Sequence, residues 1–259
     1  MSGFEPALCT VTFRSLAPPQ IVRLATEANF AAIEWAGDVH VMPGDDQAAR
    51  TVGELSRTAE LATSFGSYVS PPTDDIDAFA KALETAVTLG ASNMRIWPGT
   101  RQRDSADYSK AERRAVAESI REMAAEAARL GVTISLEYHP QSLTDTTDSA
   151  ERLIDAIGHD NVYLYWQPRP GLPIEEALAE IARIGRHVSH VHVFAWDRER
   201  NRFPLKTASD YWCSVLAALP ASRWKGRRFA MLEFVRADEQ TAFFEDAATL
   251  HRILDAQAG

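Results

Sequence analysis

The sequence predicts an α/β protein folded as a single-domain (β/α)8 TIM barrel over residues 1–259. The chain has 259 residues, close to the ~250 that such a barrel typically takes. Short apolar runs alternate with longer stretches of helical periodicity, and no Gly/Ser/Pro-rich linker separates them. This alternation implies parallel strands joined by right-handed crossovers. Eight such units favour a closed ring. The alternative is an open doubly wound sheet, but no GxGxxG motif follows the first strand.

The expected strands are short runs that are apolar throughout or at every second residue. The clearest helix is expected from Ser109 to Leu130, because its apolar residues recur on one face and Gly131 follows as a stop signal. The expected strands are Leu8–Phe13, Ala31–Ala36, Thr63–Tyr68, Asn93–Trp97, Val132–His139, Val162–Gln167, Val188–Phe194 and Phe229–Val235.

Composition, charge and cysteine content indicate which classes of protein the sequence does not resemble. Hydrophobic residues make up 46% of the chain and charged residues 24%, with a formal net charge of -9, so a nucleic-acid partner is not expected. Cys9 and Cys213 are the two cysteines, too few for a disulfide framework. The N-terminus lacks the pattern of a signal peptide, and no apolar run approaches the ~20 residues that span a bilayer. We expect a cytoplasmic protein that does not bind membranes.

Side-chain alternation along the strands predicts which residues face the barrel interior. In Val132–His139, Ile134 and Leu136 belong against the outer helices, so Glu137 and His139 point inward. The same argument, applied to the other strands, places inside the barrel Glu34, Arg95, Trp97, Gln167, His190, His192 and Glu233.

These inward polar residues have two readings. Glu34 and Arg95 could form an internal salt bridge, and a single histidine is more often a hydrogen-bonded core residue than a ligand. However, Glu137, His192 and Glu233 all fall near the last turn of their strands. The carboxyl ends of the strands are where barrel active sites lie, so the three together favour a functional site over a purely structural polar core.

The motifs ISLEYH, LYWQP, HVHVFAWD and MLEFV, with AAIEWAGDVHV earlier in the chain, resemble the xylose isomerase-like barrels, specifically their sugar phosphate isomerase/epimerase branch. The resemblance implies that one divalent cation is held by Glu137, Gln167, His192 and Glu233. Gln167 stands where that family usually has Asp. Arg198 matches a substrate-contacting arginine of the ketose epimerases, whereas Pro170 replaces a substrate-contacting histidine.

This departure at Gln167 leaves two formal negative charges among the ligands. Mg²⁺ or Mn²⁺ still suits such oxygen-rich ligands, although binding should be weaker than in the usual site. The resemblance implies a metal-dependent isomerase or epimerase of sugars or sugar phosphates. Glu137 and Glu233 would exchange the proton beside the substrate carbonyl. The residues expected to line the substrate are Glu34, His40, Arg95, Trp97, His139 and Arg198.

Other functions remain open at this point. A lyase or dehydratase acting on a polyol or keto acid could use the same metal chemistry, and Gln167 with Pro170 would also suit a non-catalytic carbohydrate-binding relative. The endonuclease branch is disfavoured, because it needs more histidines and a basic DNA-binding face. The cationic loop after His192 could bind phosphate or be a solvated loop of mixed charge. We expect a small-molecule carbohydrate as substrate, and the chain could form a homo-oligomer.

Overall fold

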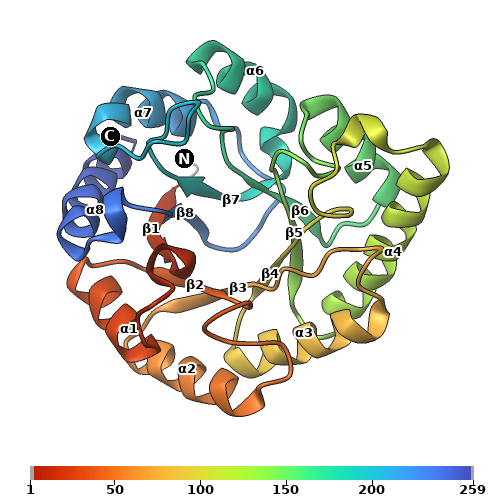
Figure 1. Cartoon of the computed structure of the whole chain (residues 1–259), viewed down its shortest axis with the longest axis horizontal. Helices are drawn as coiled ribbons and strands as arrows, with labels where there is room; N and C mark the ends of the chain where they lie inside the picture. Colours follow the sequence, from red (N-terminus) through yellow and green to blue (C-terminus); the bar gives the residue numbers. More distant parts are fainter. Residues whose placement is uncertain (1–2, 258–259) are drawn as a thin grey trace. The chain divides into compact units, whose positions relative to one another are not determined.

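The computed structural model describes residues 3–257, and its strands form a closed barrel in the order β1 to β8 (Figure 1). Each strand is followed by at least one helix, which confirms the predicted (β/α)8 architecture. The strands are β1 (Phe4–Cys9), β2 (Ala32–Ala36), β3 (Ala62–Gly66), β4 (Asn93–Ile96), β5 (Thr133–Glu137), β6 (Val162–Trp166), β7 (Val188–Val193) and β8 (Arg228–Leu232).

The longest helix begins and ends where local sequence signals predict. This helix, α4, is capped by Ser109, whose hydroxyl accepts from the Glu112 backbone N–H while the Glu112 carboxylate accepts from the Ser109 N–H; this is a capping box. Gly131 follows it with a positive φ of 73°. The helices are α1 (Pro18–Glu27), α2 (Asp46–Thr58), α3 (Ile76–Leu89), α4 (Lys110–Arg129), α5 (Thr147–Ile157), α6 (Ile174–Ile184), α7 (Ser209–Ala218) and α8 (Gln240–Asp255).

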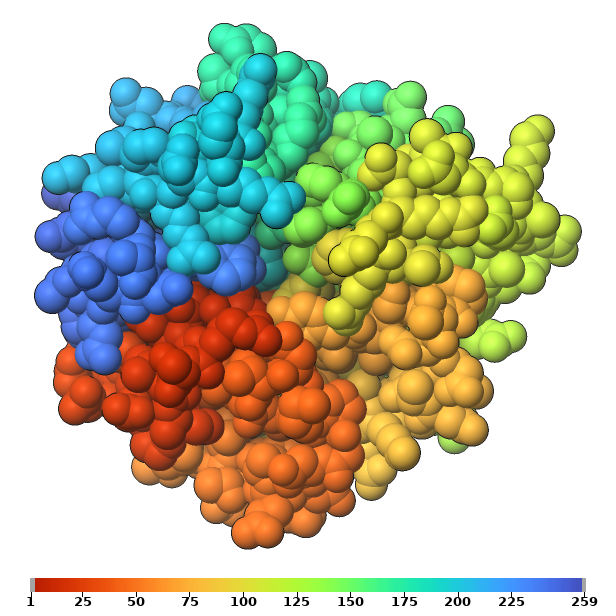
Figure 2. Space-filling view, viewed as in Figure 1, coloured from red at the N-terminus to blue at the C-terminus, as the bar shows by residue number. Residues whose placement is uncertain are grey.

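Backbone contacts divide the chain into two compact units. Unit 1 contains the described chain up to Glu34, the segment Leu55–Ala62, and the described chain from Gln167 onward. In it, β1 pairs with β2 and with β8, and β8 pairs with β7. The two ends of the chain therefore meet in this unit, where α8 packs on β1 and the red and blue segments adjoin in Figure 2.

Unit 2 contains Trp35–Glu54 and Thr63–Trp166. Its strands β3, β4, β5 and β6 pair in sequence order and in parallel. The helix α4 covers this sheet with a buried apolar face that includes Val116, Ile120 and Met123. The assignment of residues 1–259 to one domain stays a prediction.

The first strand differs from the prediction. The structure has β1 at Phe4–Cys9, and the expected strand residues Thr10–Phe13 form a buried 3-10 turn. Pro6 argues against a strand when the sequence is read alone, because it lacks an N–H. In the barrel its carbonyl accepts a hydrogen bond from the Ala31 N–H at 2.8 Å. The correction places Cys9 at the carboxyl end of its strand.

The described helices include none that is both long and apolar enough to cross a membrane.

A buried carboxyl group on α8 anchors the connection between β7 and α7 in unit 1. The side chain of Asp246 is 4% exposed and accepts a hydrogen bond from the Leu205 backbone N–H at 2.7 Å. Burial raises the pKa of Asp246 to about 6, although the Leu205 hydrogen bond acts in the opposite direction. The folded state therefore keeps the proton at pH values where the unfolded chain has released it, so the free energy of unfolding should fall as pH rises from about 4 to above 6.

Replacing Asp246 by Asn should remove this loss of stability at higher pH. The Asn side chain cannot ionise, and its amide oxygen can still accept the hydrogen bond from the Leu205 N–H. We expect Asp246→Asn to raise the free energy of unfolding at pH 7 by on the order of 1–3 kcal/mol, and to flatten its dependence on pH between 4 and 7. Urea denaturation at several pH values measures both quantities. The exposed Asp255→Asn is the matched control. An Asp246→Asn profile parallel to that of the wild type would contradict the assignment.

Candidate active site

Unit 1 brings together polar side chains from five strands or strand ends. Gln167 follows β6 directly, His192 lies on β7, and Glu233 follows β8 directly. Cys9 is the last residue of β1, and Glu34 lies in the middle of β2. The exposed fractions of these five residues range from 0% to 7%. Because the strands are parallel, side chains at their carboxyl ends gather at one end of the barrel.

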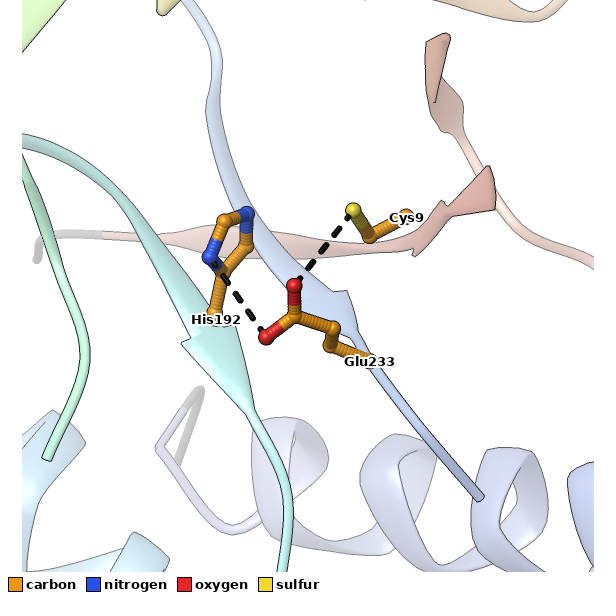
Figure 3. Close-up of side chains that lie close together, drawn as sticks. All are labelled: Cys9, His192 and Glu233. Atoms are coloured by element: carbon orange, nitrogen blue, oxygen red, sulfur yellow. Dashed lines mark hydrogen bonds and ion pairs between the residues drawn. The ribbon is translucent and has the colours of Figure 1, made fainter. Parts of the chain in front are cut away.

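The imidazole of His192 is the centre of this cluster. Its Nδ1 lies 2.9 Å from the Gln167 side-chain oxygen and 3.7 Å from a Glu233 carboxylate oxygen. Figure 3 shows the Glu233 carboxylate reaching toward both His192 and Cys9. A nitrogen, an amide oxygen and a carboxylate oxygen therefore converge on the same side of the ring.

The opposite ring nitrogen faces a second carboxylate. Nε2 of His192 lies 3.5 Å from Glu34 Oε1, and both side chains are fully buried. Histidines that bind metals through one nitrogen usually donate the other N–H to a carboxylate, which fixes the tautomer and the ring orientation. Glu34 is placed to accept such a bond from Nε2, which would leave Nδ1 available as a ligand atom.

The donors in unit 1 fit a divalent cation. Zinc and related ions bind imidazole nitrogen, carboxylate oxygen and thiolate sulfur at about 2.0–2.3 Å, so tetrahedral ligand atoms lie about 3.3–3.8 Å from one another. The cluster supplies three ligand atoms that lie within 4.8 Å of one another, one each from Cys9, His192 and Glu233. Gln167 adds an oxygen ligand beside Nδ1. The cluster could hold an ion after small adjustments of the side chains.

Glu137 lies in unit 2, where its partner is Arg95. The Arg95 guanidinium forms an ion pair with the Glu137 carboxylate, and both residues are buried. The guanidinium carbon also lies 5.3 Å from the centre of the Tyr68 ring, within the range of a cation–π contact. Thr144 donates a hydrogen bond to the Glu137 carbonyl. The roles of Glu137 as metal ligand and proton acceptor stay predictions.

Two further predicted substrate residues of unit 2 lie against each other. The rings of Trp97 and His139 have centroids 4.6 Å apart. Nδ1 of His139 lies 2.6 Å from the Pro140 carbonyl oxygen, which can accept its hydrogen. Within residues 3–257, the buried Nε1 of Trp97 has no hydrogen-bond partner. Trp97 can therefore offer a hydrogen-bond donor and His139 an Nε2 acceptor to a polar molecule.

The remaining predicted substrate residues lie on loops. His40, in unit 2, is buried and packs edge-on against the Trp35 ring with centroids 6.0 Å apart. Arg198, in unit 1, is exposed, and it lies so close to Gly171 that a Cβ there would be 2.5 Å from Arg198 Cγ and 2.9 Å from the Arg198 backbone nitrogen. Gly171 has a positive φ of 67°, so glycine suits this close approach of two loops for two independent reasons.

The loop that carries Arg198 combines charges of both signs. Asp197 accepts hydrogen bonds from the backbone and side-chain nitrogens of Asn201, and these bonds lower the pKa of Asp197. Arg202 forms an ion pair with Asp238 at 2.5 Å and lies over the Phe234 ring. These contacts make part of the loop structural, and the possibility of a phosphate site on it stays a prediction.

The second inward histidine of β7 is a core residue. Nδ1 of His190 accepts a hydrogen bond from the Phe229 backbone N–H at 3.0 Å, and its ring stacks on the Phe229 ring. Burial lowers the pKa of His190 to about 3, so it is neutral at physiological pH. Of the two histidines on this strand, only His192 lies among metal-type donors in the described chain.

Sequence reasoning missed Cys9. The expected strand Leu8–Phe13 put this residue at the start of a strand, far from the end where active sites lie. With β1 ending at Cys9, the thiol lies 3.2 Å from Glu34 Oε1 and 3.8 Å from Glu233 Oε1. Assigning Pro6 to the first strand would move that strand earlier in the chain and place Cys9 toward its carboxyl end.

The fold and this cluster define the class of protein: a (β/α)8 barrel with a candidate divalent-metal site at the carboxyl ends of its strands. Residues 22–251 match the model of the xylose isomerase-like TIM barrel family. The chain therefore belongs to the xylose isomerase-like TIM barrel family, as the sequence motifs predict.

The proteins that resemble this chain include a dehydratase and an epimerase. The chain is 29% identical over 167 residues to a 3-dehydroshikimate dehydratase from Bacillus anthracis, a match covering 60% of this chain and 59% of that relative. A crystal structure described as the probable 3-DHS dehydratase of petrobactin synthesis from Bacillus anthracis is similar, with a TM-score of 0.75 and 20% identity over 96% of this chain and 99% of that one.

Two other solved structures share the fold. A D-psicose 3-epimerase crystallised in the presence of D-fructose aligns with a TM-score of 0.72 and 16% identity, over 99% of this chain and 100% of that one. A protein crystallised with a bound zinc atom aligns with a TM-score of 0.71 and 17% identity, over 98% of each chain. At these identities the likeness extends to the fold alone.

The contact between Gln167 and His192 leads to a prediction about metal affinity. Replacing the neutral Gln167 by Asp adds a negative charge beside Nδ1, so Gln167→Asp should bind Mn²⁺ more tightly than the wild type. Titration calorimetry on metal-free protein measures the change. Gln47→Asp, which adds the same charge on the exposed surface of α2, is the matched control. Equal or weaker binding by Gln167→Asp would exclude Gln167 as a ligand and remove most of the support for the site.

Proposed function

We propose that the protein is a divalent-metal-dependent enzyme that removes a proton from the carbon beside a carbonyl group of a small polyhydroxylated substrate. The single observation that carries the proposal is the convergence of His192 Nδ1, the Gln167 oxygen and the Glu233 carboxylate, with Glu34 behind Nε2. A bound cation would supply positive charge to the oxygen that becomes negative when the proton leaves. The zinc-containing neighbour of the same fold supports a metal at this site.

The chain's own residues would have distinct tasks. Glu34 would orient His192, while Glu137 and Glu233 would carry the proton, as the sequence predicts. Arg95 would hold the Glu137 carboxylate in one orientation through their buried ion pair. Trp97 and His139 could form hydrogen bonds with substrate hydroxyl groups, because a buried donor without a partner gains a hydrogen bond when a polar ligand binds. These roles make a carbohydrate or a hydroxylated keto acid the class of substrate.

Within this class, the leading candidate is a sugar isomerase or epimerase, and the structural likeness to a D-psicose 3-epimerase supports it. A dehydratase is the second candidate, and the likeness to a 3-dehydroshikimate dehydratase supports it. Both reactions begin with loss of a proton beside a carbonyl group. They diverge at the next step, where an epimerase returns the proton and a dehydratase expels a hydroxyl group as water.

The two candidates can be separated by the fate of the substrate in D₂O. We expect metal-loaded protein to incorporate deuterium beside the carbonyl of a ketohexose such as D-psicose without loss of water, as recorded by mass spectrometry and NMR. If 3-dehydroshikimate loses one water while ketohexoses do not react, the protein is a dehydratase. If the metal-loaded protein transforms neither these nor a wider panel of ketoses and keto acids, the non-catalytic alternative gains support.

The two carboxylates can be tested with the same exchange assay. Glu137→Gln and Glu233→Gln should each slow deuterium incorporation by about 10²–10⁴-fold, because an amide can neither accept nor return the proton. Glu180→Gln is the matched control, since Glu180 is a buried glutamate on α6 that is paired with Arg169.

The metal content of each variant must equal that of the wild type, because loss of a ligand would also lower the rate. If a folded, metal-loaded amide variant exchanged deuterium at the wild-type rate, that glutamate would not be the acid–base group.

A further inference from the structure

The thiol of Cys9 belongs to the same cluster as the proposed metal ligands. Cys9 is fully buried at the end of β1, and its sulfur lies 3.2 Å from Glu34 Oε1 and 3.8 Å from Glu233 Oε1 (Figure 3). A buried cysteine is more often a small apolar core residue. In this case the sulfur contacts two carboxylates that also face His192: Glu34 Oε1 itself lies 3.5 Å from His192 Nε2, and the other oxygen of Glu233, Oε2, lies 3.7 Å from His192 Nδ1.

We propose that Cys9 is a thiolate ligand of the divalent cation, together with His192 and Glu233, and that it makes the site selective for Zn²⁺ over Mg²⁺ and Mn²⁺. The inference rests on the proposed metal site and adds both a ligand and a metal preference to it. Ligand atoms of these three residues already lie within 4.8 Å of one another in the described chain.

The spacing of these atoms suits a small, closed site. Cys9 Sγ and Glu233 Oε1 are 3.8 Å apart, and His192 Nδ1 and Glu233 Oε2 are 3.7 Å apart. Ligand atoms of a tetrahedral zinc ion lie about 3.3–3.8 Å from one another when the bonds are about 2.0–2.3 Å long. Rotation of the side chains would bring the ligand atoms around one ion, with the Gln167 oxygen as a fourth donor.

The types of ligand atom decide which metal ion the site prefers. Mg²⁺ and Mn²⁺ favour sites composed of oxygen ligands, whereas thiolate and imidazole ligands select zinc and other softer ions. The Cys9 thiolate and the Glu233 carboxylate together carry two negative charges, which balance a divalent cation although Gln167 is neutral. Metal binding breaks the S–H bond, forms a metal–sulfur bond and releases the proton to solvent.

Cobalt(II) provides a direct spectroscopic test, since thiolate coordination gives it a strong near-ultraviolet charge-transfer band. We expect Co²⁺-loaded wild-type protein to show this band and Cys9→Ser to lack it while still binding Co²⁺. Cys213→Ser, which alters the other cysteine, is the matched control and should keep the band. Cys9→Ser should also weaken Zn²⁺ binding by about tenfold or more and change Mn²⁺ binding much less.

Failure of this inference and failure of the proposed function give different results. If wild-type protein binds Co²⁺ without the band, or Cys9→Ser keeps it, the thiolate ligand is excluded and the metal site remains. If wild-type protein binds no divalent ion, both proposals are wrong. X-ray absorption at the zinc edge avoids dependence on a variant that could misfold: zinc-loaded wild-type protein should show one sulfur neighbour at about 2.3 Å, and its absence would overturn the inference.

Discussion

The arrangement of unit 1 depends on how the His192 imidazole is held. Gln167 and Glu233 contact its Nδ1 side, and Glu34 contacts its Nε2 side. Each of these partners comes from a different strand or strand end, so the ring orientation depends on the register of the barrel. The pairing of Val191 with Ala230 and of Leu8 with Leu232 fixes that register for β7, β8 and β1. A shift of one residue would turn His192 away from its partners.

The fixed orientation of the His192 ring also explains why the cluster suits a metal ion. Two carboxyl groups and a thiol lie around one imidazole in a region from which solvent is excluded. Such groups are stable inside a protein when they are paired, hydrogen-bonded or bound to a cation. A cation bound to Nδ1 would also move the ring hydrogen to Nε2, where the Glu34 carboxylate can accept it. Ligand binding and ring orientation would therefore support each other in this cluster.

The sequence predicts the architecture well because its signals are local and repeated. Apolar periodicity locates most of the strands and helices, and the Ser109 cap and Gly131 mark the ends of α4 closely. Alternation also selects His192 and Glu233 without knowledge of the partners across the barrel. The prediction is wrong for the first strand because Pro6 argues against a strand, while the apolar residues of the buried 3-10 turn after Cys9 resemble strand residues. The strand is therefore expected to begin later in the chain than it does.

Side-chain pairing is harder to predict than strand position. The structure pairs Arg95 with Glu137 in unit 2 and places Glu34 beside His192 and Cys9 in unit 1, whereas the salt bridge between Glu34 and Arg95 that the sequence leaves open stays a prediction. These contacts depend on strand register and on rotamers, which periodicity does not encode. The distinction between His190 and His192 likewise comes from their neighbours, since the two residues share the same parity on one strand.

Anomalous X-ray diffraction from crystals of zinc-loaded protein tests the central claim most directly. We predict one strong anomalous peak at about 2.0–2.3 Å from His192 Nδ1, Glu233 and Cys9 Sγ, with the Gln167 oxygen beside it and Glu34 hydrogen-bonded to Nε2. A peak bonded to Nε2, or zinc bound elsewhere with the His192 cluster vacant, would contradict the account.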